Sequence, residues 1–198
     1  IARNDDLYHG KDQPAISDDG RYITFRSTAT SLVPGDSTIA WFANLDGSGS
    51  FGPLQLITTE IDQPTALATG RIDADAALDV VTSSKLDQRI AWYYNGLTTS
   101  GKFAGPFDIS VSMAAASAVE TGDMDGDGDI DVLATAPDLS SSSWFRNQGG
   151  SFVGAETISA YGLCRTLCPA DVDGDGDLDV LFANDFSTGE IAWYENRD

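Results

Sequence analysis

The chain has 198 residues, of which 41% are hydrophobic and four are Trp, so it is long enough and apolar enough to bury one sizeable core. Its formal net charge of -20 is concentrated, because the stretches 73–79, 123–131 and 171–179 hold 13 of the 31 acidic residues. The sequence offers no basic patch to meet phosphates, which disfavours a nucleic-acid partner. It also contains no apolar run near the ~20 residues that a membrane span requires.

Four Trp-containing phrases recur along the chain at a spacing near 50 residues. They are IAWFAN, IAWYYN, SSWFRN and IAWYEN, around Trp41, Trp92, Trp144 and Trp193. A repeat of this length predicts a propeller or another array of supersecondary units. Short apolar runs separated by turn residues predict four antiparallel strands in each full unit, which is the blade of a β-propeller. We therefore expect an all-β fold of four four-stranded blades in a single domain.

The units follow one another along the chain as blades of about 12–58, 62–110, 114–159 and 162–198. The expected strands of the second and third units are 63–69, 78–83, 90–94 and 105–110, then 115–121, 130–136, 142–146 and 151–159. In the first unit a tight turn at Asp18–Gly20 stands where later units have acidic loops. The fourth unit ends after its third strand. We expect residues 1–4 to supply the missing strand and so to close the ring.

Two nine-residue loops, DMDGDGDID and DVDGDGDLD, carry the strongest chemical signal. Asp at every second position would be strongly repulsive without a cation, and calcium prefers six to eight hard oxygens. Positions 1, 3, 5 and 9 can offer carboxylates and position 7 a backbone carbonyl. The expected ligands are Asp123, Asp125, Asp127, Asp131 and the carbonyl of Asp129, then Asp171, Asp173, Asp175, Asp179 and the carbonyl of Asp177. We therefore predict two calcium sites, with Gly128 and Gly176 making the sharp turn at position 6.

These loops begin like an EF-hand but end differently. An EF-hand needs a bidentate Glu at position 12 and flanking helices, whereas position 12 here is Ala134 or Phe182. The short apolar runs DVLATA and DVLFAN that close the loops predict buried strands instead. Each metal loop is thus expected to join two strands.

The second unit carries a degenerate copy of the loop, RIDADAALD. Arg71 occupies position 1, and Ala residues replace both glycines, while Asp73, Asp75 and Asp79 keep positions 3, 5 and 9. A cation at the first ligand position would repel calcium, so we expect no metal there. Arg71 either pairs with Asp73 or Asp79 or points to solvent over a plain turn.

The phrases VETGDMDGDGDIDVLATA, PADVDGDGDLDVLFAN, IAWYEN and GSFVGAETIS resemble the FG-GAP and VCBS repeats of integrin-α-like propellers, over roughly residues 39–198. The segment PAISDDGRYITFRSTATSLVPGD resembles instead a TolB-type propeller repeat, which has no metal loop. The resemblance implies calcium-binding modules of extracellular proteins, including lectins and integrin heads, and some relatives that are polysaccharide lyases. Because such propellers usually have six to eight blades, four units form either a compact ring or part of a larger one.

The leading expectation is a secreted or cell-surface module without enzymatic activity, which binds a glycan or a protein and uses calcium as structural cement. Two alternatives stay open: an extracellular carbohydrate-active enzyme, either a polysaccharide lyase or a hydrolase, and a structural repeat unit of a larger surface protein. Assembly into a homo-oligomer is left open as well.

A candidate ligand-binding face follows from strand order. If the metal loops join first and second strands, the connections between second and third strands emerge at the opposite edge, where binding loops on a rigid scaffold are common. The charged residues of these connections are Asp36, Lys85, Asp87, Arg89, Asp138, Asp185 and Glu190. The plainer alternative is that they are solvated turns.

The two cysteines, Cys164 and Cys168, lie four residues apart. On one extended strand their Cα atoms would be about 13 Å apart, too far for a disulfide. We expect two buried thiols on the same strand face.

Overall fold

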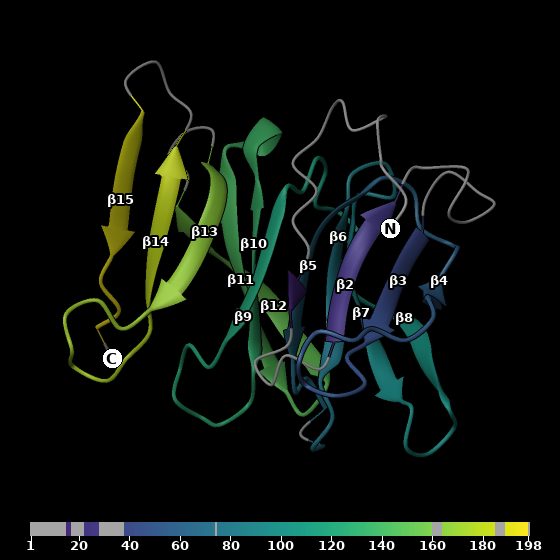
Figure 1. The fold of residues 1–198 in the computed structure, drawn as a ribbon. Coiled ribbons are helices and arrows are strands. Elements are labelled where there is room, and N and C mark those ends of the chain that lie inside the picture. Colours follow the sequence, from purple (N-terminus) through teal and green to yellow (C-terminus); the bar gives the residue numbers. More distant parts are fainter. Residues whose placement is uncertain are drawn as a thin grey trace.

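The computed structural model describes residues 15–16, 22–27, 38–73, 75–159, 164–184 and 189–197. These residues form fifteen strands and one turn of 3-10 helix, arranged in four antiparallel sheets (Figure 1). The all-β prediction is therefore confirmed. Among the same residues, no helix is long and apolar enough to cross a membrane.

The strands of each sheet are hydrogen-bonded in chain order. The first sheet consists of β1 (Ala15–Ile16), β2 (Tyr22–Ser27), β3 (Thr38–Ala43) and β4 (Gln55–Thr58). The second consists of β5 (Pro64–Gly70), β6 (Asp79–Ser84), β7 (Arg89–Gly96) and β8 (Lys102–Ser110). The third consists of β9 (Ala118–Gly122), β10 (Asp131–Ala136), β11 (Ser141–Gln148) and β12 (Ser151–Ser159), with the helix η1 (Pro137–Leu139) before β11. The fourth consists of β13 (Cys164–Ala170), β14 (Asp179–Asn184) and β15 (Glu190–Tyr194).

The strands expected in the second and third units are all present, with bounds shifted by a few residues. Their sequence alternates short apolar runs with Gly- and Asp-rich turns, which is why the boundaries could be anticipated. Each acidic loop joins the first strand of its sheet to the second, as expected. In the second and third sheets, the connections between the second and third strands lie at the opposite edge in Figure 1.

Consecutive sheets pack through their first strands, so that β5 lies beside β9, and β9 beside β13. The approach is close: a Cβ added at Gly70 would lie 3.0 Å from Ile130, and one added at Gly122 would lie 3.0 Å from Leu178. Both glycines end the first strand of a sheet and face the acidic loop of the next sheet. A side chain at either position would push neighbouring sheets apart.

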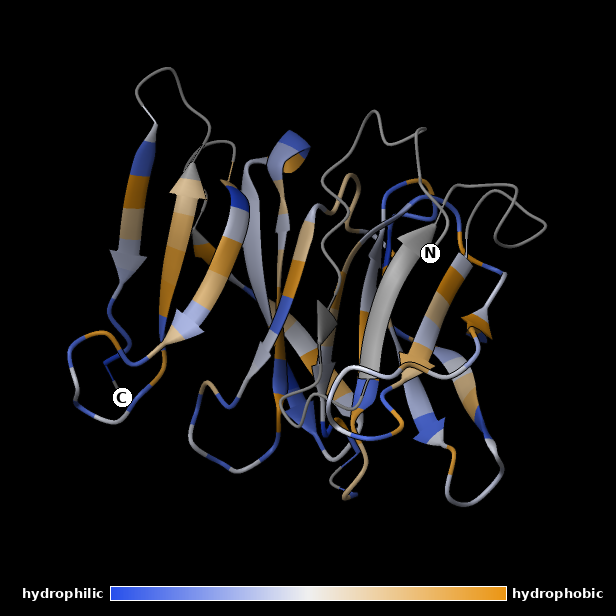
Figure 2. Ribbon diagram, viewed as in Figure 1, coloured by the Kyte–Doolittle hydropathy of each residue, from blue (hydrophilic) through white to orange (hydrophobic). Residues whose placement is uncertain are grey.

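Three apolar clusters fill the spaces between consecutive sheets. The largest joins the second and third sheets through Trp92, Val132 and Phe145. A second joins the third and fourth sheets, and the last joins the first and second. The central strand β14 is hydrophobic along most of its length (Figure 2), and its Val180 and Phe182 pack in the cluster shared with the third sheet.

The described sheets do not close into a ring. The first and fourth sheets lie at opposite ends of the row in Figure 1, and the packed strand pairs belong to consecutive sheets. Closure by residues 1–4, and most of the first blade's early part, lie outside the described residues. The four-bladed ring therefore stays a prediction.

The expectation for the cysteines was half right. Both thiols are free, and Cys164 is buried, but Cys168 is exposed. The pairing of β13 with β14 is irregular between Cys164 and Thr166. An irregularity of this kind shifts the alternation of side chains, so Leu167 rather than Cys168 shares the buried face with Cys164.

Candidate metal centres

Glycines give the third and fourth acidic loops their shape. Gly126 and Gly128 have φ angles of +67° and +93°, and Gly174 and Gly176 have +82° and +107°. Residues with a side chain rarely adopt these angles, so both positions favour glycine. The resulting turns bring the start of each loop back toward its end.

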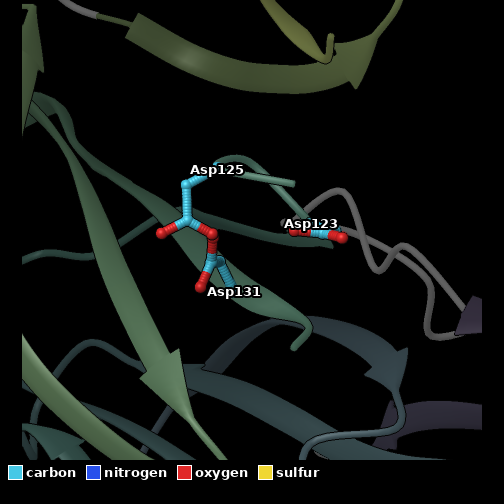
Figure 3. Close-up of side chains that lie close together, drawn as sticks. All are labelled: Asp123, Asp125 and Asp131. Carbon is cyan, nitrogen blue, oxygen red and sulfur yellow. The ribbon is translucent and has the colours of Figure 1, made fainter. Parts of the chain in front are cut away.

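The folded loops gather carboxylates at two places. Asp123, Asp125 and Asp131 each offer an oxygen within 4.8 Å of the others (Figure 3). Asp171, Asp173 and Asp179 form the same arrangement in the fourth sheet. These are positions 1, 3 and 9 of each predicted loop, so two acidic clusters that could hold a metal ion are present where the sequence places them.

Position 9 also ties the loop to the sheet. Asp131 is buried and accepts hydrogen bonds from the backbone N–H groups of Met124, at 3.1 Å, and Asn147, at 2.7 Å. Asp179 accepts equivalent bonds from Val172 and Asn196. This carboxylate therefore joins the loop to the third strand of its own sheet.

The Asn that ends the Trp phrase completes this frame, and in the third and fourth units it also reaches the preceding sheet. The side chain of Asn147 donates to the carbonyl of Ile72 at 2.7 Å, and that of Asn196 donates to the carbonyl of Met124 at 2.8 Å. Sequence reasoning missed this role. The signal was available, because every Trp phrase ends in Asn.

Unpartnered oxygens show that the third loop fits a cation. Asp123 Oδ1 and Asp125 Oδ1 are buried and have no hydrogen-bond partner. A buried carboxylate oxygen without a donor is costly, and a metal ion at the centre of the cluster would satisfy both. The donor set consists entirely of carboxylates, which suits a hard cation.

The carboxylates at positions 5 and 7 lie outside the two clusters. Asp127 and Asp175 are exposed, and each accepts a hydrogen bond from the backbone N–H two residues later, at 2.9 and 3.0 Å. Asp129 accepts from the N–H of Gly149. The structure thus brings together three of the four expected carboxylates in each loop.

The second loop keeps the frame but gathers no such cluster. Asp79 accepts from the backbone N–H groups of Ile72 and Asn95, as Asp131 and Asp179 do in their loops. The carboxylates of Asp73, Asp75 and Asp79, all described, are not among the groups that converge. Ala76 at position 6 is not one of the residues with positive φ, so the turn there differs.

Arg71 is exposed, and the ion pairs of the described residues do not include it. The expected pairing with Asp73 or Asp79 is therefore not seen, and the plainer alternative of an Arg that points to solvent fits the structure.

Burial shifts the titration of several loop carboxylates. It raises the pKa of Asp79 to about 6, with smaller contributions from Asp73 and Asp75. It also raises the pKa of Asp131. Loss of solvation raises the pKa of Asp173 too, with added repulsion from Asp175, Asp179 and Glu195. The fold itself thus disfavours the charged form that a bound cation would favour.

The two clusters differ in the charge of a nearby residue: Arg146 on β11 lies near the cluster of the third loop, and Glu195, just after β15, lies near that of the fourth. Arg146 Nε lies 3.1 Å from Asp125 Oδ2, as an ion pair without an aligned hydrogen bond, and its guanidinium stacks 4.7 Å from the centre of the Trp144 ring. The equivalent residue in the fourth unit is Glu195, whose charge acts on Asp173. Sequence reasoning missed both, although SSWFRN and IAWYEN differ visibly there.

The candidate ligand face is only partly described. Lys85, Asp87, Asp138 and Glu190 are exposed at the edge opposite the acidic loops, and Arg89 is half-buried and paired with Asp108 at 2.8 Å. Asp87 is held by Ser84 Oγ and the N–H of Asp62. Asp36 and Asp185 lie outside the described residues, so the face stays a prediction.

Among the described residues, four successive antiparallel sheets, three of which carry an acidic loop between their first and second strands, define the chain as an all-β repeat protein. Residues 72–134 and 123–182 each match the family model described as an FG-GAP-like repeat, and together they cover more than half of the chain. The chain therefore belongs to the family of proteins with FG-GAP-like repeats. Each match runs from one acidic loop to the strand beyond the next. No curated protein matches the chain.

Proposed function

We propose that the protein binds two calcium ions, one in each cluster, and that these ions fix the loops of an extracellular recognition module with β-propeller blades. The proposal rests chiefly on the two clusters of converging carboxylates, one of which contains two buried oxygens without partners. The VCBS and TolB-type resemblances belong to the same proposal.

Calcium suits these loops better than other common metals. The clusters contain no His or Cys, which zinc and copper favour. The remaining ligands would come from backbone carbonyls and water on turns that are largely exposed, and calcium accepts such flexible shells whereas magnesium demands a near-ideal octahedron. Calcium sites of extracellular modules typically have dissociation constants of about 0.1–1 mM, which is the range we expect for these loops.

Isothermal titration calorimetry tests the metal sites directly. We expect two calcium ions per wild-type chain and one per chain for Asp125→Asn and for Asp173→Asn, since Asn keeps an oxygen but loses the charge. Glu60→Gln, an exposed acid outside the loops, should still bind two. A wild-type chain that binds no calcium would contradict the proposal.

Recognition is proposed for the edge opposite the metal loops. Lys85 and Asp138 are exposed there on separate connections of a rigid sheet scaffold. Glycan-array binding of the wild type, compared with Lys85→Glu and Asp138→Lys, measures this. Any bound glycan should lose affinity in at least one reversal and keep it in Glu60→Gln. Unchanged binding in both reversals would move recognition elsewhere.

A further inference from the structure

Arg146 on β11 lies within reach of two carboxylates. Its Nε is 3.1 Å from Asp125 Oδ2 of the third loop, and its Nη2 is 3.8 Å from Glu156 Oε1 on β12. The side chain of Asp125 is 13% exposed, whereas that of Glu156 is 66% exposed. One guanidinium is thus within ion-pair distance of both a candidate metal ligand and a solvent-facing acid on the next strand.

A bulge in β12 brings Glu156 to this position. Trp144 is paired with Glu156 and Arg146 with Val153, so β12 has one residue more than β11 between these two pairs. Gly154, within the bulge, has a φ of +71°. The guanidinium of Arg146 lies 4.7 Å from the centre of the Trp144 ring, which supports it from one side. A small movement over this ring is enough to exchange one carboxylate for the other.

The contact between Arg146 and Asp125 is held by charge rather than by an oriented hydrogen bond. Arg146 Nε is buried and has no hydrogen-bond partner, although Asp125 Oδ2 is only 3.1 Å away. The other oxygen of this carboxylate, Asp125 Oδ1, is also buried and unpartnered. An ion pair of this kind weakens when another cation neutralises the carboxylate.

The third unit is the one in which such a pair of charges accompanies an acidic cluster. At the place of Arg146, the other units have Ala43, Tyr94 and Glu195. Opposite the Trp of the first and second sheets stand Gln55 and Phe107, where the third sheet has Glu156. The second unit, whose loop gathers no cluster, therefore has neither charge.

We propose that Arg146 is a calcium-dependent switch, which pairs with Asp125 in the absence of calcium and moves to Glu156 when calcium binds to the third loop. This rests on the calcium site proposed above. A divalent ion neutralises Asp125 and repels the guanidinium, whereas Glu156 lies outside the cluster and stays attractive. Calcium binding thereby strengthens a contact between β11 and β12. Glu156 is a positioning residue that sets the calcium affinity of the loop through Arg146.

A double-mutant cycle tests this coupling in Asp173→Asn, which leaves the third loop as the calcium site. While Arg146 is present, Glu156→Gln should weaken calcium binding in calorimetry about three- to fivefold, or ~0.7–1 kcal/mol, the upper range for a largely exposed ion pair. In Arg146→Gln the same change should have much less effect, because only the direct attraction between carboxylate and calcium is lost. Glu60→Gln, an exposed acid outside the loops, is the control and should leave the affinity unchanged.

The Nε–H resonance of Arg146 in NMR, assigned by its loss in Arg146→Gln, measures the movement itself. In Asp173→Asn it should shift over the same calcium range as the calorimetric titration, and Glu156→Gln should reduce the shift. Arg89 is the internal reference, because it pairs with Asp108 at 2.8 Å in a sheet whose loop gathers no cluster. Its resonance should not move, and its presence shows that each variant is folded.

Two results would overturn the switch and leave the calcium site in place. One is equal weakening by Glu156→Gln with and without Arg146. The other is an Arg146 resonance that stays unchanged while calorimetry records one bound ion. A folded Asp173→Asn chain that binds no calcium would instead remove the third site, and the switch with it.

Discussion

The second and third acidic loops share a backbone frame but differ in the chemistry placed on it. In both, the Asp at position 9 is buried. Its carboxylate accepts hydrogen bonds from the backbone N–H at position 2 and from the backbone N–H of the Asn that ends the Trp phrase. In the third loop the carboxylates at positions 1, 3 and 9 converge, whereas in the second loop Arg71 occupies position 1 and is exposed.

This difference separates what the fold requires from what a metal requires. The frame around Asp79 and Asp131 joins loop, sheet and third strand, and it persists in the second loop, where the carboxylates do not converge. Convergence of the other carboxylates additionally needs an acid at position 1 and positive φ at positions 4 and 6, which Gly126 and Gly128 supply. We infer that the metal site is an addition to a frame that folds without it.

Calcium removal should have the largest effect on the free energy of unfolding, and this effect should come from the third and fourth loops. If free calcium exceeds the dissociation constant about 100-fold, each site stabilises the fold by ~2.7 kcal/mol, or about 5 kcal/mol for two sites. Urea unfolding with calcium and with a chelator measures this. The double variant Asp125→Asn with Asp173→Asn should respond little to the chelator. An equal response in that variant would show that the stabilising calcium binds elsewhere.

The buried carboxyl of Asp79 should make stability depend on pH in a loop without metal. Its pKa in the folded protein, about 6, lies above the ordinary value of 3.8, so the folded state holds the proton more tightly. The stabilisation is present below about pH 4 and is lost as the pH rises toward 6, by about 3 kcal/mol in total.

Asp79→Asn removes this dependence while keeping an acceptor oxygen. The difference in unfolding free energy between wild type and Asp79→Asn, measured in urea at pH 4, 5, 6 and 7, should therefore change by about 2.4 kcal/mol across this range. Because both proteins keep the third and fourth loops, their titration cancels in the difference. A constant difference across this range would mean that Asp79 is not protonated in the fold.

A third metal site should be recoverable in the second loop. Arg71→Asp restores the first ligand, and Ala74→Gly with Ala76→Gly restores the freedom to turn. The triple variant should bind three calcium ions in calorimetry and gain up to ~2.7 kcal/mol at 100 times the dissociation constant. The two Gly substitutions alone are the control and should still give two ions. A triple variant that stays at two would show that the frame around Asp79 cannot adopt the metal-binding turn.

Much of this organisation was predictable because it is repeated. The Trp phrases fixed the period, and the alternation of apolar runs with Gly and Asp turns located the strands of the second and third sheets. Ring closure could not be judged in this way, because local patterns specify the strands of a sheet but not the angle between successive sheets. Cys168 was misplaced for a similar reason, since an irregular strand pairing leaves no mark in the alternation of residue types.

At the metal loops, spacing identified the converging carboxylates but not their neighbours. Asp127 and Asp175 occupy expected ligand positions, yet they bond to their own loop backbone. Local turn bonds of Asp compete with metal ligation, and sequence spacing does not decide between them. Arg146 and Glu195 approach the clusters from another strand, which only the folded sheet reveals.

The smallest expected effect comes from Arg146 and Glu195. They should give different calcium affinities to two loops that have the same pattern of Asp residues. Arg146 places a cation 3.1 Å from Asp125, whereas Glu195 adds a negative charge near Asp173 and is itself paired with Arg197 at 2.6 Å. We therefore expect the fourth loop to bind calcium more tightly than the third. At about 8 Å in a largely aqueous setting, one unit charge changes the binding free energy of a divalent ion by ~1 kcal/mol, or about fivefold in affinity.

Single-site backgrounds separate the two affinities. In Asp173→Asn, which leaves the third loop, adding Arg146→Gln should tighten calcium binding about fivefold. In Asp125→Asn, which leaves the fourth loop, adding Glu195→Gln should weaken it by a similar factor. Both effects should shrink in 1 M salt, since half-exposed charges are screened. Unchanged affinity after Arg146→Gln would mean that the guanidinium leaves Asp125 without cost when calcium binds. The charge of Arg146 would then not make the third loop bind calcium more weakly than the fourth.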